Sequence, residues 1–118
     1  IRSHEANTPC ILVDCLGTWV TALIDDADAW VDHDRATEVV TAACTELTAA
    51  ITASSSAILL VSNEVGSGVV PGSSSGRLFR DLLGIVNVQV AQVCDRVTLM
   101  VAGRALSLPH PQQTEASL

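Results

Sequence analysis

The chain has 118 residues, of which 48% are hydrophobic and 16% charged, so it has the length of one domain and is too apolar to be disordered. Six arginines, no lysine and 13 acidic residues give a formal net charge of −7. This charge argues against nonspecific nucleic-acid binding and against a polybasic membrane anchor. The absence of lysine excludes a G-x-x-x-x-G-K-[ST] phosphate loop and a Schiff-base lysine within the chain.

No stretch of the sequence has the length and composition of a membrane span. The longest uncharged run, residues 47–63, is interrupted by three serines, whereas a span needs about 20 predominantly apolar residues. The first five residues include neither an initiator methionine nor an apolar signal core. We therefore expect a piece from the middle of a longer protein that does not enter a membrane.

Four short apolar runs predict β-strands. Residues 10–13, 57–61 and 97–101 are apolar without alternation, which is typical of strands buried on both faces, as in a parallel sheet. A fourth run, residues 105–108, follows the third too closely for a parallel crossover. We therefore predict that the third and fourth runs form an antiparallel hairpin.

Three patterns between these runs predict helices. Residues 36–51 and 77–93 have apolar side chains every three or four positions, and residues 16–24 form a shorter pattern. Either Asp32 or Asp34 can cap the start of the middle helix.

The order strand, helix, strand, helix, strand is typical of an α/β fold. Three helices cannot easily cover both faces of a small three-stranded sheet. We therefore expect further strands beside these, from a missing N-terminal portion or from neighbouring subunits. Gly84, inside the last helix, costs about 1 kcal/mol relative to alanine, which predicts a packing reason for it.

Cysteines, histidines and tryptophans give no strong sign of a metal centre or a nucleophile. The cysteines lack C-x-x-C pairs, so we expect buried free thiols in a reducing cytosol. A loop histidine exposed to solvent is the favoured interpretation of His33, and His4 and His110 lie in terminal segments. Trp19 and Trp30 are expected to be packing or interface residues. The cysteines are Cys10, Cys15, Cys44 and Cys94.

Two of the predicted strands end in acidic residues. Asp14 follows the first run, and Asn63 and Glu64 follow the second. Ligands of open α/β sheets bind outside the carboxyl ends of strands, and an acid there can hold Mg²⁺ beside a nucleoside triphosphate. Two other interpretations stay open: Asp14 can cap the helix of residues 16–24, and Glu64 can be a solvated loop residue.

A glycine- and serine-rich segment, residues 65–76, leads into the last predicted helix. Glycines let the backbone approach a ligand, and the free N–H groups of a helix N-terminus favour anions. Arg77 and Arg80, predicted in the first turn, can clamp phosphates. The alternative is a plain surface loop followed by a surface charge pair of Arg80 and Asp81.

Three groups of motifs together resemble one family, the bifunctional adenosylcobinamide kinase / adenosylcobinamide-phosphate guanylyltransferase of cobalamin biosynthesis. The resemblance extends from Cys10 to Leu108 and is most specific from Ser62 to Asp81. The motifs are ILVDCL at 11–16 with WVT at 19–21; VSNEVG at 61–66 with GVVP at 68–71, RLFRDL at 77–82 and Asn87; and VAG at 101–103.

This resemblance implies a P-loop-NTPase-like three-layer α/β fold with a mostly parallel sheet and a C-terminal antiparallel hairpin. Residues 1–108 would be the C-terminal part of a single nucleotide-binding domain, and 109–118 a polar tail. It also implies a cytoplasmic homotrimer that uses Mg²⁺. The enzyme would phosphorylate adenosylcobinamide with a nucleoside triphosphate (ATP or GTP) and then transfer GMP from GTP to adenosylcobinamide phosphate.

The same match implies roles for individual residues. Asp14 and Glu64 would be catalytic, with Asp14 near the nucleotide and Mg²⁺ as the metal ligand, and Asn63 would line the same nucleotide site. The residues bordering the loop, also on the nucleotide, would be Arg77, Arg80 and Asp81.

The chain also departs from the family pattern. The phosphate loop and the guanylylated histidine of the family lie N-terminal to the residues present, and His4 does not have that histidine's context. Gly17 and Ala22 replace polar residues, and residues 73–76 replace a bulkier charged stretch. We therefore expect the chain alone to be inactive, since most of the apparatus for phosphoryl transfer is missing. The alternatives are a non-catalytic binding or assembly module and an unrelated P-loop-like kinase fragment.

Overall fold

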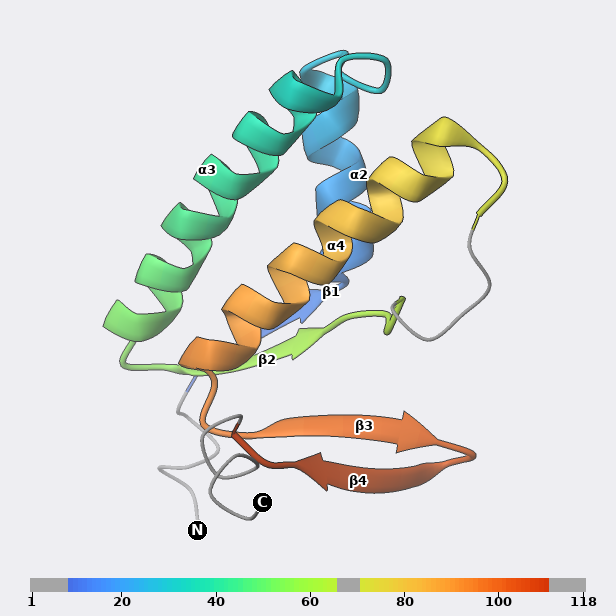
Figure 1. Ribbon diagram of the computed structural model, residues 1–118. Helices are drawn as coiled ribbons and strands as arrows, with labels where there is room; N and C mark the ends of the chain where they lie inside the picture. The colour runs from blue at the N-terminus through green and yellow to red at the C-terminus, as the bar shows by residue number, and fades with distance from the viewer. Residues whose placement is uncertain (1–8, 66–70, 111–118) are drawn as a thin grey trace, which may run out of the picture.

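The computed structural model describes residues 9–65 and 71–110. The expected strands and helices are all present there, each within a few residues of its predicted range (Figure 1). In chain order they are β1 (Cys10–Asp14), α2 (Leu16–Asp26), α3 (His33–Ala53), β2 (Ala57–Val61), α4 (Ser74–Val93), β3 (Val97–Val101) and β4 (Arg104–Leu108).

The strands form two separate sheets within the described residues. β1 pairs in parallel with β2, in a register that sets Cys10 opposite Ala57 and Asp14 opposite Val61. β3 pairs with β4 as the expected antiparallel hairpin. The expectation that β3 also joins the parallel sheet is wrong for this part of the chain, because β3 pairs with β4 alone. The result is an α/β fold with a small parallel sheet and a hairpin.

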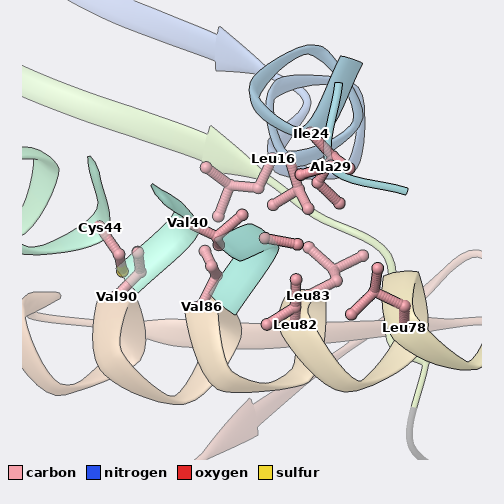
Figure 2. Close-up of a cluster of buried hydrophobic side chains, with 12 residues drawn as sticks. Leu16, Ile24, Ala29, Val40, Cys44, Leu78, Leu82, Leu83, Val86 and Val90 are labelled. Carbon is pink, nitrogen blue, oxygen red and sulfur yellow. The ribbon is translucent and has the colours of Figure 1, made fainter. Parts of the chain in front are cut away.

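The core lies among the three helices rather than inside a sheet. Figure 2 shows apolar side chains of α2, α3 and α4 meeting between the helices. Val13 and Leu60, on the helix-facing side of the parallel sheet, pack against this cluster. The buried members are Leu16, Val20, Ile24, Ala29, Ala36, Val40, Cys44, Leu78, Leu82, Leu83, Val86 and Val90.

The other face of the parallel sheet is open. Leu12 and Leu59, which are partners in the register, are 60% and 58% exposed, and Val61 is 41% exposed. The expectation that these strands are buried on both faces is therefore wrong within the described residues. The reason is that the helices all lie on one side of the sheet (Figure 1).

Side chains cap the starts of two helices close to the predicted positions. Asp32 Oδ1 accepts a hydrogen bond from the backbone N–H of Arg35 at 3.1 Å, so Asp32 caps α3. Cys15 caps α2, because its Sγ accepts from the backbone N–H of Thr18 at 3.4 Å. The interpretation of Asp14 as the cap of α2 is therefore wrong.

The four cysteines are free thiols, but only one is buried as expected. Cys44 lies in the core, Cys15 and Cys94 are half-buried, and Cys10 is exposed. Across residues 9–65 and 71–110, no three His, Cys, Asp or Glu side chains are grouped so that they could hold a metal ion. No helix in those ranges has the length and apolarity to cross a bilayer.

Both tryptophans pack against the core, as expected. The indole N–H of Trp30 also donates to Asp25 Oδ1, which ties the end of α2 to the loop that follows. His33 is exposed but begins α3 rather than lying in a loop, and its Nε2 is 3.2 Å from Ser74 Oγ. His110 is exposed, and His4 lies outside the described residues.

Substitutions at two neighbouring positions of α4 should change the free energy of unfolding in opposite directions, because one position faces the core and the other faces outward. Leu83 is fully buried, so Leu83→Ala should lower the free energy of unfolding by about 2–5 kcal/mol. A Cβ at Gly84 would meet no atom within 4 Å, so the predicted packing reason for this glycine is wrong within the described residues. Gly84→Ala should raise the free energy of unfolding by about 0.5–1 kcal/mol, since alanine favours the helix. Urea denaturation of both variants measures the difference, and a loss of stability in Gly84→Ala would contradict it.

Candidate functional site

Two sequence-predicted acids lie at the carboxyl edge of the parallel sheet. Because β1 and β2 are parallel and end level, Asp14 and the segment after Val61 emerge at the same edge. The side chains of Asp14 and Glu64 are both exposed. The peptide bond between Asp14 and Cys15 is cis. The structure thus brings the two strand-end acids to one edge.

Asn63 lies beside the first turn of α2, the helix that follows Asp14. A Cβ built on Gly17 would be 3.3 Å from Asn63 Oδ1, 3.6 Å from Leu83 Cδ2 and 3.6 Å from Phe79 Cζ. Glycine at position 17 therefore leaves room for the Asn63 amide and for α4 at the start of α2. This close approach gives a structural reason for Gly17, where the resembled family has a polar residue.

Asn87 of α4 holds the segment that follows β2. Its Nδ2 donates to the carbonyl oxygen of Asn63 at 2.9 Å, and its Oδ1 accepts from the hydroxyl of Ser62. These bonds fasten the backbone beside Glu64 to the middle of α4. The site prediction omitted Asn87, although it belongs to the resembled motif. The signal that could have identified Asn87 was its position, since it is a polar residue within the apolar pattern of the last predicted helix.

The serine-rich segment before α4 is partly helix rather than loop. Ser73 caps the helix by accepting from the backbone N–H of Gly76 at 3.0 Å, and the helix begins at Ser74. Arg77 Nη1 donates to the carbonyl oxygens of Pro71 and Gly72, at 3.2 Å each. Because α4 begins earlier than predicted, Arg80 lies in its second turn and not in its first.

Arg80 and Asp81 form a charge pair near the surface. Arg80 Nη2 lies 2.9 Å from Asp81 Oδ1, and Arg80 Nε donates to the same oxygen at 3.2 Å. The two side chains are 28% and 61% exposed, so solvent screens the pair. Together with Val65 they line an open hollow of about 450 Å³ beside α4. The alternative that the sequence left open, a surface charge pair of Arg80 and Asp81, is therefore confirmed.

The thiol of Cys15 lies at this edge next to Asp14. The Thr18 hydroxyl, 3.2 Å from Sγ, and the Thr18 backbone N–H hold the pKa of Cys15 below its usual range, because both stabilise the thiolate. Burial raises the pKa of Cys44, and burial with the nearby Asp95 charge raises that of Cys94.

This difference predicts the order of cysteine alkylation. Below about pH 8, Cys15 should have the larger thiolate fraction and react with iodoacetamide faster than Cys44, which is also shielded by the core. Thr18→Val removes the hydroxyl, so the pKa of Cys15 should rise and its reaction should slow. Mass spectrometry of labelled peptides over a pH series gives both rates. An unchanged Cys15 profile in Thr18→Val would contradict the role of the hydroxyl.

The bonds of Asn87 predict a local effect of its removal. Asn87→Ala should lower the free energy of unfolding by about 1 kcal/mol and should speed hydrogen exchange of the amides after β2. Gln92→Ala, at an exposed position of the same helix, is the control and should leave that exchange unchanged. Equal exchange in the two variants would show that Asn87 does not hold the segment.

With this geometry in place, comparison with known proteins decides the family. A family model described as cobinamide kinase / cobinamide phosphate guanyltransferase matches residues 1–108. The chain belongs to this family. The resemblance drawn from the motifs is therefore confirmed.

Three bacterial relatives have names that agree with this family assignment. The bifunctional adenosylcobalamin biosynthesis protein CobP of Pseudomonas aeruginosa is 38% identical over 117 residues, which are 98% of this chain and 60% of the relative. CobU of Escherichia coli, with the same description, is 37% identical over 99 residues, or 79% of this chain and 54% of the relative. CobU of Salmonella typhimurium is 35% identical over 109 residues, or 87% and 60%. The chain thus spans between about half and three fifths of the length of these relatives.

Proposed function

We propose that this chain is part of an enzyme that phosphorylates adenosylcobinamide with a nucleoside triphosphate and then transfers GMP from GTP to adenosylcobinamide phosphate. The observation that supports this proposal is the combination of family membership with the position of three residues. Asp14, Asn63 and Glu64 of this chain lie at one carboxyl edge of its parallel sheet. In open α/β sheets this is the edge where ligands bind. ATP or GTP would serve the first reaction and GTP the second.

The residues at the strand ends suit a magnesium-bound nucleotide. Mg²⁺ takes oxygen ligands and is usually held by one or two carboxylates together with substrate phosphates. The exposed carboxylate of Asp14 supplies such a ligand, and Glu64 provides a second carboxylate at the same edge. When bound, Mg²⁺ neutralises charge on the phosphates. Asp14 and Glu64 would then be the catalytic residues, and Asn63 would orient the nucleotide.

The residues on α4 would border the same nucleotide. Arg80 uses its Nε and Nη2 on Asp81, and because a guanidinium has five N–H donors, others stay able to reach a phosphate. Asp81 would keep Arg80 oriented. Arg77 fixes Pro71 and Gly72 by hydrogen bonds and would shape the end of the loop before α4.

The rest of the apparatus would come from outside this chain. The chain has no lysine, so it cannot supply a lysine-bearing phosphate loop, and its relatives are longer. We therefore propose a P-loop-NTPase-like domain to which this chain contributes the strand-end acids, and a chain that is inactive alone. By the family resemblance, we place the complete enzyme in the cytoplasm as a homotrimer.

A chimaera tests the proposed reactions. This chain replaces the matching region of the P. aeruginosa relative, and radiolabelled ATP and GTP are supplied with cobinamide and Mg²⁺. Asp14→Asn and Glu64→Gln should each lower kcat by about 100-fold or more, the scale of losing one preorganised electrostatic contact. The isolated chain should give no turnover.

Matched substitutions elsewhere control for charge. Asp26→Asn at the end of α2 and Glu46→Gln in α3 change exposed acids away from the strand ends and should leave kcat within about twofold. Circular dichroism checks that each variant is folded. Full turnover in both Asp14→Asn and Glu64→Gln would refute the proposed roles, and robust activity of the isolated chain would refute its dependence on a further segment.

A further inference from the structure

The side-chain amide of Asn87 is bonded through both of its polar atoms to two consecutive residues. Its Nδ2 donates to the carbonyl oxygen of Asn63 at 2.9 Å, and its Oδ1 accepts from the hydroxyl of Ser62. Because the amide is planar, one bond to each of its ends fixes its orientation as well as its position. Asn87 therefore holds the chain at the two residues that directly precede Glu64.

The helix that carries Asn87 gives this amide a rigid base. Leu83 and Val90, which lie one turn before and one turn after Asn87 in the sequence of α4, are both buried in the core. Residues three and four positions apart are neighbours on the surface of a helix. Asn87, which is half-buried, thus stands at the margin of the packed face of α4 and moves little relative to the core.

The segment that Asn87 holds is also confined from the side of α2. A Cβ built on Gly17 would lie 3.3 Å from Asn63 Oδ1, which is closer than ordinary van der Waals contact. The Asn63 amide therefore lies directly against the first turn of α2. Asn63 is held by α4 through its carbonyl oxygen and limited by α2 through its side chain, so two helices define where the next residue, Glu64, leaves the sheet.

The ladder of the parallel sheet does not fix this segment. The pairing of β2 with β1 ends at Val61, and residues 62–65 belong to neither a strand nor a helix. A carboxylate that stabilises charge in a reaction must be held in place beforehand, and a displacement of about 1 Å can lower a rate by about 100-fold. The bonds of Asn87 supply the restraint that the ladder does not.

Stability alone is a weak account of these two bonds. Ser62 and Asn63 are exposed, and in the unfolded chain water bonds to the same polar groups, so the net contribution to stability is modest. The restraint on position is larger in effect, because the two bonds join a segment beside a candidate catalytic acid to a helix packed in the core.

We propose that Asn87 is a positioning residue for the reaction and that it acts through Glu64. By holding Ser62 and the carbonyl of Asn63, it presents the Glu64 carboxylate at the edge of the sheet where Asp14 also lies. Asn87 itself need not touch the nucleotide or the cobinamide. This inference rests on the proposed function, and it adds that the contribution of Glu64 to the rate depends on an amide from α4.

Kinetics of the chimaera with the P. aeruginosa relative test this role in two backgrounds. Asn87→Ala should lower kcat by about tenfold or more and change the KM of the nucleotide by less than about threefold, because a misplaced acid weakens contacts made in the transition state. When Glu64→Gln is already present, Asn87→Ala should lower kcat by less than about twofold, since the group through which it acts has been altered.

Two further variants separate the bonds from the helix. Asn87→Asp keeps an oxygen that can accept from Ser62 but puts an oxygen in place of the donor to Asn63, so it should lose as much activity as Asn87→Ala. Gln92→Ala, at an exposed position of α4, is the matched control and should leave kcat within about twofold. Circular dichroism checks that each variant is folded.

NMR relaxation of the chain gives a readout that does not require turnover. The order parameter of the Glu64 backbone amide should fall from near the rigid value of about 0.85 toward the flexible range below about 0.6 in Asn87→Ala, and should stay unchanged in Gln92→Ala. An unchanged order parameter in Asn87→Ala would overturn the inference.

The kinetic outcomes distinguish this inference from the proposed function. Full turnover in Glu64→Gln would overturn the proposed role of Glu64 and the inference with it. Slow turnover in Glu64→Gln, combined with an equal further loss from Asn87→Ala in both backgrounds, would overturn only the role of Asn87. Unchanged kcat in Asn87→Ala, or a loss that appears in KM alone, would do the same.

Discussion

The packing of α4 against α2 and α3 is the interaction on which the rest of the structure depends. Within the described residues the parallel sheet has two strands and is covered on one side, so nearly all of the buried apolar side chains belong to the helices. An isolated helix in water is marginally stable, and tertiary packing of its apolar face is what holds it. The segment after β2 is held in turn by α4, through the hydrogen bonds of Asn87. It contributes Leu78, Leu82, Leu83, Val86 and Val90 to the core.

The sequence predicted the existence and type of every described element, because the spacing of apolar residues follows the period of a helix or a strand that buries one face. It predicted boundaries less well where caps decide them. Ser73 to Gly76 resemble a loop in composition, yet Ser73 caps α4 and the following residues form its first turn. The pairing of β3 could not be predicted from periodicity, since an apolar run identifies a strand but not its neighbour. For the same reason, the apolar runs could not predict that one face of β1 and β2 is open within the described residues.

The candidate site also has some features that the sequence could predict and others that it could not. The meeting of Asp14 with the segment of Asn63 and Glu64 was predictable, because parallel strands bring their carboxyl ends to one edge. The cap formed by Cys15 was not, since aspartate is the more usual capping residue and stands one position earlier. The bracing by Asn87 depends on a contact between residues far apart in the sequence. Such contacts appear only once the chain is folded.

The double attachment of Asn87 has a mechanical consequence. The backbone that carries Asn63 and Glu64 is tied to the same helix that packs against α2 and α3 in the core. A displacement of α4 would therefore move the backbone beside Glu64, and the packing that holds α4 also holds this segment. The order of the segment that carries Asn63 and Glu64 is therefore coupled to the stability of the helical core.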